Sequence, residues 1–351
     1  MSAGLLAFFI ALTASLLLTV PVRALAIRVG MVDAPGPRKV HLTPIPLLGG
    51  LAIYAGIMIA ILVVFDGPAR AQSFGIVTGA TLVAVVGFLD DRGWLHHQVK
   101  LFIAMPLAAV ILLASGVRAN VFETLVTGSL GFWLDAALTV LWVVGITASF
   151  SILDHMDGLC AGVAAMASVF FAMLAYLNGQ TIVTTLAAAT LGAAAGFLRW
   201  NFKPAKIFMG DGGAMLLGFL MATLALKMRF EHAANLSAWL APVLVLGATI
   251  FDTTLVTISR SRRGLLPFAT PGKDHSAHRL ANLGLGQRGA VLVIYLVGAG
   301  CGGAGVLVSY LSTQWAALVA ITIALAMLLA VELLERAPYE KQRPKQASPS
   351  I

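Results

Sequence analysis

The chain has 351 residues, of which 59% are hydrophobic and 11% charged, and its 23 Lys and Arg exceed its 15 Asp and Glu by 8. A soluble domain carries roughly 25% charged residues, so the composition excludes a conventional water-exposed shell and predicts a polytopic membrane protein. In such a protein excess positive charge typically marks cytoplasmic loops, and we expect no nucleic-acid partner.

Eleven apolar runs recur along the chain, each about as long as the 17–22 residues that cross a bilayer as a helix. They cover residues 3–21, 47–65, 74–90, 101–117, 132–152, 159–177, 181–198, 213–229, 237–257, 289–310 and 313–333. The alternating polarity of a membrane barrel is absent, so the sequence predicts an all-α protein with about eleven transmembrane helices. We expect one transmembrane domain, residues 1–335, and a polar cytoplasmic tail, residues 336–351.

The first run resembles a signal peptide, and RALA imitates a cleavage site, but positive charge follows the run at Arg23 and Arg28 instead of preceding it. These flanking charges favour a retained helix with its N-terminus outside. That orientation leaves only four cations outside, namely Arg70, Arg118, Lys227 and Arg229. We therefore expect a multi-pass protein of the inner membrane with its C-terminus and its acidic motifs on the cytoplasmic face.

The third run ends on two adjacent acids, Asp90 and Asp91. They can be a solvated helix end that pairs with Arg92 or Lys100. They can also form a site for a hard cation, because a divalent metal lets adjacent carboxylates coexist and magnesium binds oxygen ligands and substrate phosphates.

A second acidic pair, Asp154 and Asp157, lies in SILDHMDGLCAG. A spacing of three residues predicts that both project from one helix face. Chance explains one such pair, but a second pair on the same side of the membrane favours a site. Gly158 and Gly162 are expected to permit close helix packing.

The stretch NFKPAKIFMGDGG places Lys203 and Lys206 before a glycine-rich turn that opens an apolar helix. Free N–H groups at such a helix start form an anion site. Asp211 within this turn is either an ordinary helix cap or a carboxylate that a metal joins to the anion.

The loop SRSRRGLLPFATPGKDHSAHR gathers five cations and two histidines, namely Arg260, Arg262, Arg263, Lys273, Arg279, His275 and His278. A plain cytoplasmic loop explains this charge, and beside an acidic metal-type site it also fits a clamp for diphosphate oxygens. Asp252, in the preceding apolar run, is expected to pair with one of these arginines.

Acids that suit magnesium, groups that suit phosphate and a membrane location together indicate phosphoryl transfer at the bilayer surface. An ion-coupled transporter is the rival class. Transporters place their acids near the membrane midplane, on broken helices and in repeats, whereas these acids end helices on one face and no repeat is visible.

Five ordered motifs resemble the polyprenyl-phosphate N-acetylhexosamine-1-phosphate transferases: GMVDAPGPRKVHLTPIPLLGG, GFLDDR, DHMDGLCAG, NFKPAKIFMGDGG and the late basic loop with its histidines. The resemblance covers residues 30–290 and is closer to the GlcNAc branch. It implies transfer of a HexNAc-1-phosphate, GlcNAc-1-phosphate first, from a UDP-sugar to undecaprenyl or another polyprenyl phosphate. UMP is released, the cofactor is Mg²⁺ or Mn²⁺, and the product starts a lipid-linked cell-envelope glycan.

The same resemblance implies roles for the residues at matching positions. The catalytic set is Asp90, Asp91, Asp154, Asp157 and Lys100. The metal ligands are Asp211, Asp91 and Ser151. The substrate-binding set is Arg38, Lys39, His41, Ser151, Lys206, Arg262, Arg263, His275, His278 and Arg279.

The chain departs from the family pattern at four positions. Ala148 and Ser151 stand where the family has asparagines, His155 where it has glycine, and Ala277 where it has a histidine. One of those asparagines can be a metal ligand, so Ser151 or Asp154 would take that task. These departures keep open another UDP-sugar, or a degenerate member that binds without turnover; a homodimer is also compatible with the sequence.

Overall fold

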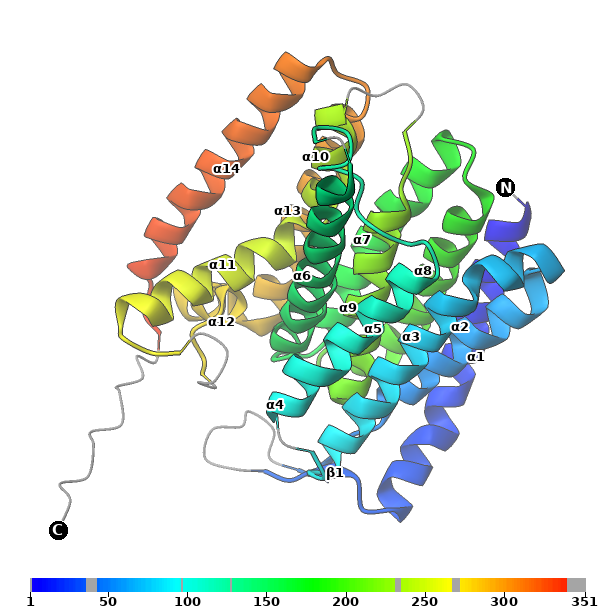
Figure 1. The fold of residues 1–351 in the computed structure, drawn as a ribbon. Helices are drawn as coiled ribbons and strands as arrows, with labels where there is room; N and C mark the ends of the chain where they lie inside the picture. Colours follow the sequence, from blue (N-terminus) through cyan, green and yellow to red (C-terminus); the bar gives the residue numbers. More distant parts are fainter. Residues whose placement is uncertain are drawn as a thin grey trace, which may run out of the picture.

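The computed structural model describes residues 2–35, 43–95, 97–126, 128–230, 235–266 and 272–339. These residues form a bundle of long helices, with one short hairpin near its lower end in the view of Figure 1. The prediction of an all-α membrane protein is confirmed.

The long helices are α1 (Ser2–Arg28), α2 (Gly49–Val64), α3 (Gly67–Asp91), α5 (Met105–Ala114), α6 (Ser129–Leu153), α7 (Leu159–Leu177), α8 (Thr181–Asn201), α9 (Gly210–Lys227), α10 (Asn235–Val245), α11 (Gly247–Arg262), α13 (Gly286–Val308) and α14 (Thr313–Glu335). The short ones are α4 (His97–Val99) and α12 (Ser276–Leu280), and the π-helical turns are η1 (Lys100–Ala104) and η2 (Ala281–Leu285). Strands β1 (Val32–Asp33) and β2 (Ile45–Pro46) pair antiparallel.

Each of the eleven apolar runs is helical, but the count of eleven spans is not confirmed. In the described part of the chain, seven helices are long and apolar enough to cross a membrane, or eight if α10 and α11 form one bent span. The apolar helices Gly49–Val64 and Lys100–Ala114 are shorter than a full span.

The run 237–257 is not one continuous helix in the structure. The helix breaks after α10, and α11 continues at an angle of 74°. Pro242 lies inside α10 and has no N–H for the helical ladder. Gly247 starts α11 at a close approach to α13, where a Cβ would lie 2.9 Å from Cys301 Sγ. The bend sends α11 away from the bundle, toward the lower end of α14 (Figure 1).

Helix α9 forms the centre of the bundle and packs against α2, α3, α6, α7 and α8. Between Gly210 and Leu226 every residue except Asp211 is buried. Glycines bring the neighbouring backbones close: a Cβ at Gly50 would lie 2.3 Å from Gly213 N, and one at Gly218 would lie 2.8 Å from Thr147 Cα. Since α9 is held on all sides, the position of its N-terminus is fixed, and with it the position of Asp211.

Candidate active site

Three parts of the chain far apart in sequence, residues 90–100, Ser151 and Asp211, bring polar side chains to the N-terminus of α9. Lys100 donates hydrogen bonds to Asp90, at 2.7 Å, and to Asp211. Ser151, near the end of α6, donates to the other oxygen of Asp211 at 2.6 Å. The predicted convergence of the acids is therefore observed for Asp90 and Asp211, with Lys100 between them.

Two glycines with positive φ shape this place. Gly93, at φ +73°, ends α3 just after the paired acids, and its N–H donates to Asp90 O at 2.7 Å. Gly210, also at φ +73°, precedes Asp211, and a Cβ there would lie 2.4 Å from Asp91 Oδ2. Only glycine meets both demands at position 210, because L side chains rarely adopt this conformation.

The carboxylate of Asp91 caps the N-terminus of α9. It accepts hydrogen bonds from Asp211 N at 2.8 Å and from Gly212 N at 3.1 Å. The free N–H groups expected to bind an anion are thus occupied by a side chain of the protein itself. Sequence reasoning missed this contact; a catalytic or metal-binding role for Asp91 stays a prediction.

Asp154 and Asp157 do not project from one helix face, so that expectation is wrong. Asp154 ends α6, and the turn that follows leads to Gly158, whose φ of +79° is left-handed, before α7 begins at Leu159. Asp157 accepts a hydrogen bond from Ala205 N at 3.1 Å and so ties this turn to the loop before α9.

Asp154 is held beside like charges. Burial, together with the nearby carboxylates of Asp211, Asp91 and Asp157, raises the pKa of Asp154 to about 8. Among the described residues no group donates a hydrogen bond to it. Below a pH of about 8 this carboxyl is mostly protonated unless a cation lies beside it.

The oxygen groups near Asp211 are of the kind that magnesium prefers, namely the carboxylates of Asp90 and Asp154 and the hydroxyl of Ser151. Among the described residues these carboxylates do not bring three oxygens within 4.8 Å of one another, and the ammonium of Lys100 lies between Asp90 and Asp211, so a magnesium site here stays a prediction. The carboxylate of Asp154 without a described donor is the observation that favours this reading.

Two further residues that position the site were not found from the sequence. Asn201, at the end of α8, accepts from Gly158 N at 3.0 Å and donates to Ile207 O at 3.0 Å. Tyr295 donates to Gly158 O at 2.6 Å, and a Cβ at Gly162 would lie 1.9 Å from its hydroxyl. The close packing expected at Gly162 is thus observed. A buried asparagine ending an apolar helix was the available signal for Asn201.

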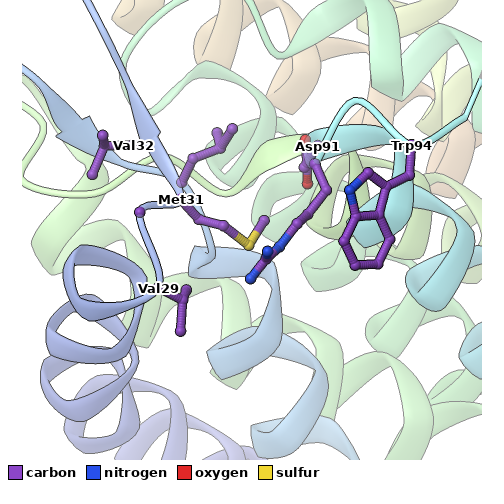
Figure 2. Close-up of a pocket in the computed structure, with 8 residues that line it drawn as sticks. Val29, Met31, Val32, Asp91 and Trp94 are labelled. Carbon is purple, nitrogen blue, oxygen red and sulfur yellow. The ribbon is translucent and has the colours of Figure 1, made fainter.

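A cavity of about 220 Å³ lies on the other side of Asp91 (Figure 2). Its lining residues are Val29, Gly30, Met31, Val32, Leu47, Asp91, Arg92 and Trp94. The guanidinium of Arg92 lies 5.3 Å from the centre of the Trp94 ring, and no described acid forms an ion pair with Arg92. The exposed atoms that line this cavity are mainly polar, so it suits the anionic end of a ligand rather than an apolar body.

The arginines expected to clamp a diphosphate have partners within the protein. Asp274 accepts from Arg260 at 3.0 and 2.7 Å and from Arg263 at 2.6 Å. Burial alone would raise the pKa of Asp274, but these hydrogen bonds outweigh it and lower the pKa to about 2. Arg262 pairs with Glu332 at 2.5 Å on the surface.

Asp252 does not pair with an arginine, so that prediction is wrong. Its carboxylate lies 2.9 Å from His275 Nδ1 and accepts from Ser276 N and Oγ at 2.8 and 2.6 Å. The arginines have other partners: Arg260 and Arg263 pair with Asp274, Arg262 with Glu332 and Arg279 with Glu335. Asp252 instead fixes the imidazole of His275.

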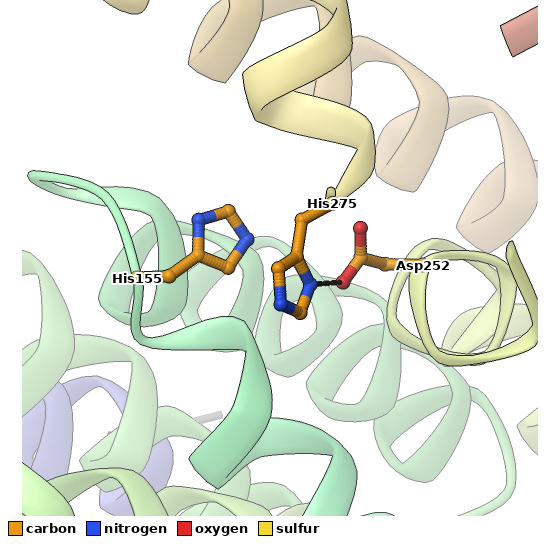
Figure 3. Close-up of side chains that lie close together, drawn as sticks. All are labelled: His155, Asp252 and His275. Carbon is orange, nitrogen blue, oxygen red and sulfur yellow. Dashed lines mark hydrogen bonds and ion pairs between the residues drawn. The ribbon is translucent and has the colours of Figure 1, made fainter. Parts of the chain in front are cut away.

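His155 lies in the turn between Asp154 and Asp157. It packs against the histidine loop, Asp274 to Leu280, through His275 (Figure 3). Its ring stacks on His275, with centroids 4.1 Å apart, and lies 4.7 Å from His278. Burial lowers the pKa of His155 well below its usual value, and the adjacent His275 adds to this effect, so the ring is neutral. Since Asp154 precedes it in the chain, the histidine loop borders the acidic cluster.

His155, His275 and Asp252 offer metal-ligand atoms within 4.8 Å of one another. Asp252 already accepts hydrogen bonds from Ser276 N and Oγ and lies 2.9 Å from His275 Nδ1. Both ring nitrogens of His155, by contrast, are buried and have no hydrogen-bond partner in the described part of the chain.

Several predicted substrate-binding residues are not brought to the cluster. The ammonium of Lys206 lies 5.5 Å from the Trp200 ring, and no described contact joins it to the acids. Arg279 is fully buried beneath the end of α14. Arg38, Lys39 and His41 lie outside the described residues.

Comparisons with known proteins identify the family of the chain. Residues 73–229 match the model of glycosyl transferase family 4. A probable undecaprenyl-phosphate N-acetylglucosaminyl 1-phosphate transferase of Bacillus subtilis is 36% identical over 297 residues, 83% of this chain and 81% of the relative. A decaprenyl-phosphate N-acetylglucosaminephosphotransferase of Mycolicibacterium smegmatis is 32% identical, over 92% of this chain and 87% of the relative. An Escherichia coli K12 undecaprenyl-phosphate alpha-N-acetylglucosaminyl 1-phosphate transferase is 28% identical, over 86% and 83%.

Proposed function

The chain belongs to the polyprenyl-phosphate N-acetylhexosamine-1-phosphate transferases of glycosyl transferase family 4, and from this premise we propose that it transfers GlcNAc-1-phosphate from UDP-GlcNAc to a polyprenyl phosphate. The names of its relatives supply both the sugar and the lipid class. The observation that carries the proposal is the meeting of Asp90, Lys100 and Asp211 at one end of the bundle.

The reaction joins two phosphates. An oxygen of the lipid phosphate attacks the phosphorus that bears the sugar, the bond from that phosphorus to the bridging oxygen breaks, and UMP leaves with the bond's electrons. The product is a lipid-linked sugar diphosphate. Because the reacting groups are anions, catalysis consists mainly of holding them in line and offsetting their charge.

The residues of the cluster divide this work. Asp211, Asp154 and Asp90, with Ser151, are the groups that would hold Mg²⁺, which supplies positive charge to the phosphate oxygens when bound. Lys100 is a second cation at the same place and can move from its carboxylate partners to a phosphate oxygen. Asp91 holds the N-terminus of α9 and so keeps Asp211 in register; Asp157 does the same for the loop before α9.

The cavity beside Asp91 is suited to the acceptor lipid. Arg92 provides a cation for the lipid phosphate, and the ring of Trp94 lies beside its guanidinium. The carboxylate of Asp91 separates this cavity from the N-terminus of α9, so the acceptor would lie next to Asp211.

The donor nucleotide belongs on the side of the histidine loop, where His275 and His278 stack around His155. The distribution of Lys and Arg supports placing this end of the bundle in the cytoplasm and the protein in the inner membrane. The UDP-sugar would then arrive from the cytoplasm and the lipid from within the bilayer.

The proposal is tested by incubating purified protein with undecaprenyl phosphate, Mg²⁺ and one of a panel of UDP-sugars, with UMP measured. We expect release with UDP-GlcNAc, and none when the lipid or the metal is left out. Release with a different UDP-sugar alone would reassign the sugar, and no release with any donor would point to a member that binds without turnover.

A further inference from the structure

The end of α14 covers a buried arginine of the histidine loop. Arg279 is fully buried, and its Nη1 donates to Leu334 O at 3.0 Å and to Glu335 Oε1 at 2.5 Å. Its Nε donates to Asp274 O at 2.7 Å. One guanidinium therefore joins the C-terminal end of the last helix to the residue that precedes His275.

Tyr339, four residues past the end of α14, packs its ring over the guanidinium of Arg279. Its ring centre lies 3.9 Å from the guanidinium carbon of Arg279, which is cation–π distance. Its hydroxyl lies 3.2 Å from Ser259 Oγ on α11 and donates to Glu335 at 3.4 Å. A second contact holds the backbone next to Tyr339: the side chain of Asn282 donates to Pro338 O at 2.9 Å.

The contacts continue from Arg279 to the candidate active site. Asp274 is held by Arg260 and Arg263 as well as by its carbonyl bond to Arg279. The next residue, His275, is fixed by Asp252 and stacks on His155, which follows Asp154 in the chain.

We propose that Tyr339 is a positioning residue: its ring holds Arg279 against the end of α14 and thereby fixes the histidine loop, Asp274 to Leu280, at the donor side of the site. Neither Tyr339 nor Glu335 touches the acidic cluster in the described structure, so their effect passes through the loop. The inference rests on the proposed function in one respect, that the histidine loop contacts the donor nucleotide.

Two substitutions separate the ring from the hydroxyl. Tyr339→Phe keeps the ring over Arg279, whereas Tyr339→Leu removes the π face. We expect Tyr339→Leu to weaken UDP-GlcNAc binding by about tenfold and to leave the KM for undecaprenyl phosphate unchanged. Tyr339→Phe should retain most of the affinity of the unchanged protein for UDP-GlcNAc. Tyr310→Leu is the matched control, because Tyr310 is an exposed tyrosine that follows α13.

Hydrogen exchange provides the readout that does not depend on turnover. Amides of residues 274–280 should exchange faster in Tyr339→Leu than in the unchanged protein or in Tyr339→Phe, while those of α9 keep their rates. A merely structural role predicts a lower unfolding temperature with equal changes in both KM values. That result, or unchanged exchange in the loop, would overturn the proposal.

His275→Ala distinguishes the two ways of failing. If His275→Ala weakens donor binding and Tyr339→Leu does not, the positioning role is wrong and the donor assignment stands. If His275→Ala leaves donor binding unchanged, the donor assignment itself is wrong. If Tyr339→Leu does not fold, Glu335→Gln, which weakens the same contact from the helix side, is measured in its place with the same expectation.

Discussion

Asp91 caps the helix that begins with Asp211: its carboxylate accepts the Asp211 and Gly212 amides at 2.8 and 3.1 Å. Paired acids at the end of a membrane helix therefore have different partners. Asp90 faces Lys100, and Asp91 fixes the backbone that presents Asp211. This division gives the first prediction.

Asp91→Asn should reduce both turnover and stability. An amide group in place of one carboxylate oxygen would face the Asp211 or Gly212 N–H, so the cap loses about 1 kcal/mol and Asp211 loses its register. Asp90→Asn should reduce turnover with a smaller loss of stability, because Asp90 contacts a side chain instead of the helix start. UMP release and thermal unfolding in detergent measure the two effects. Equal unfolding temperatures in the two variants would rule out the capping role.

Asp211→Ala should lower kcat by at least ~10²-fold, the scale seen when a preorganised electrostatic partner is removed. Ser151→Ala removes only the 2.6 Å hydrogen bond to Asp211 and should cost less, about tenfold. Initial rates of UMP release at saturating substrates measure both. Near-normal turnover of Asp211→Ala would remove Asp211 from the site.

Magnesium binding should release a proton from Asp154. The pKa of this carboxyl is raised to about 8 by burial and by the carboxylates around it, so below that pH it is mostly protonated, and a bound cation must displace the proton. Magnesium affinity should rise with pH up to about 8 and then level off. Calorimetry in buffers of different ionisation enthalpy would count the proton. Asp154→Asn should reduce the number of protons released on magnesium binding, and an unchanged number would assign the proton to another group.

The raised pKa of Asp154 also makes the stability of the metal-free protein depend on pH. Because folding raises this pKa, the contribution of Asp154 to the free energy of unfolding is fully favourable below its unfolded pKa of about 4. This contribution is lost as the pH rises through 8. Added Mg²⁺ should therefore stabilise the protein more at pH 8 than at pH 6, which thermal unfolding in detergent can measure. A smaller effect at pH 8 would contradict the assignment.

Orientation can be tested with introduced cysteines, because Cys160 and Cys301 are both buried. Cysteines next to Lys100, Lys203 and Lys273 should be shielded from membrane-impermeant reagents in intact cells. One at Asn178, between α7 and α8, should react. Labelling of the first three would reverse the topology and place the acidic cluster outside.

The sequence predicted the helical class and one shared membrane face for Asp90 and Asp211, because apolar run length and charge distribution are local properties that the bilayer constrains. It did not predict the break before Gly247 or the partner of Asp252, since both depend on which side chains of other helices lie nearby. His155 carried a signal, as a histidine in place of glycine, but its stacking on His275 follows from the path of α11 and the loop after it. Asn201 and Tyr295 act through backbone groups of Gly158, which no sequence pattern identifies.

The central claim, that the acidic cluster moves a sugar phosphate and not a sugar, is tested most directly with UDP-GlcNAc labelled both in the sugar and in the phosphate that bears it. Purified protein, undecaprenyl phosphate and Mg²⁺ should transfer the two labels to the lipid in equal amounts, with unlabelled UMP released, and Asp211→Ala should lose both labels together. Transfer of the sugar label alone, with the phosphate label left in UDP, would contradict it.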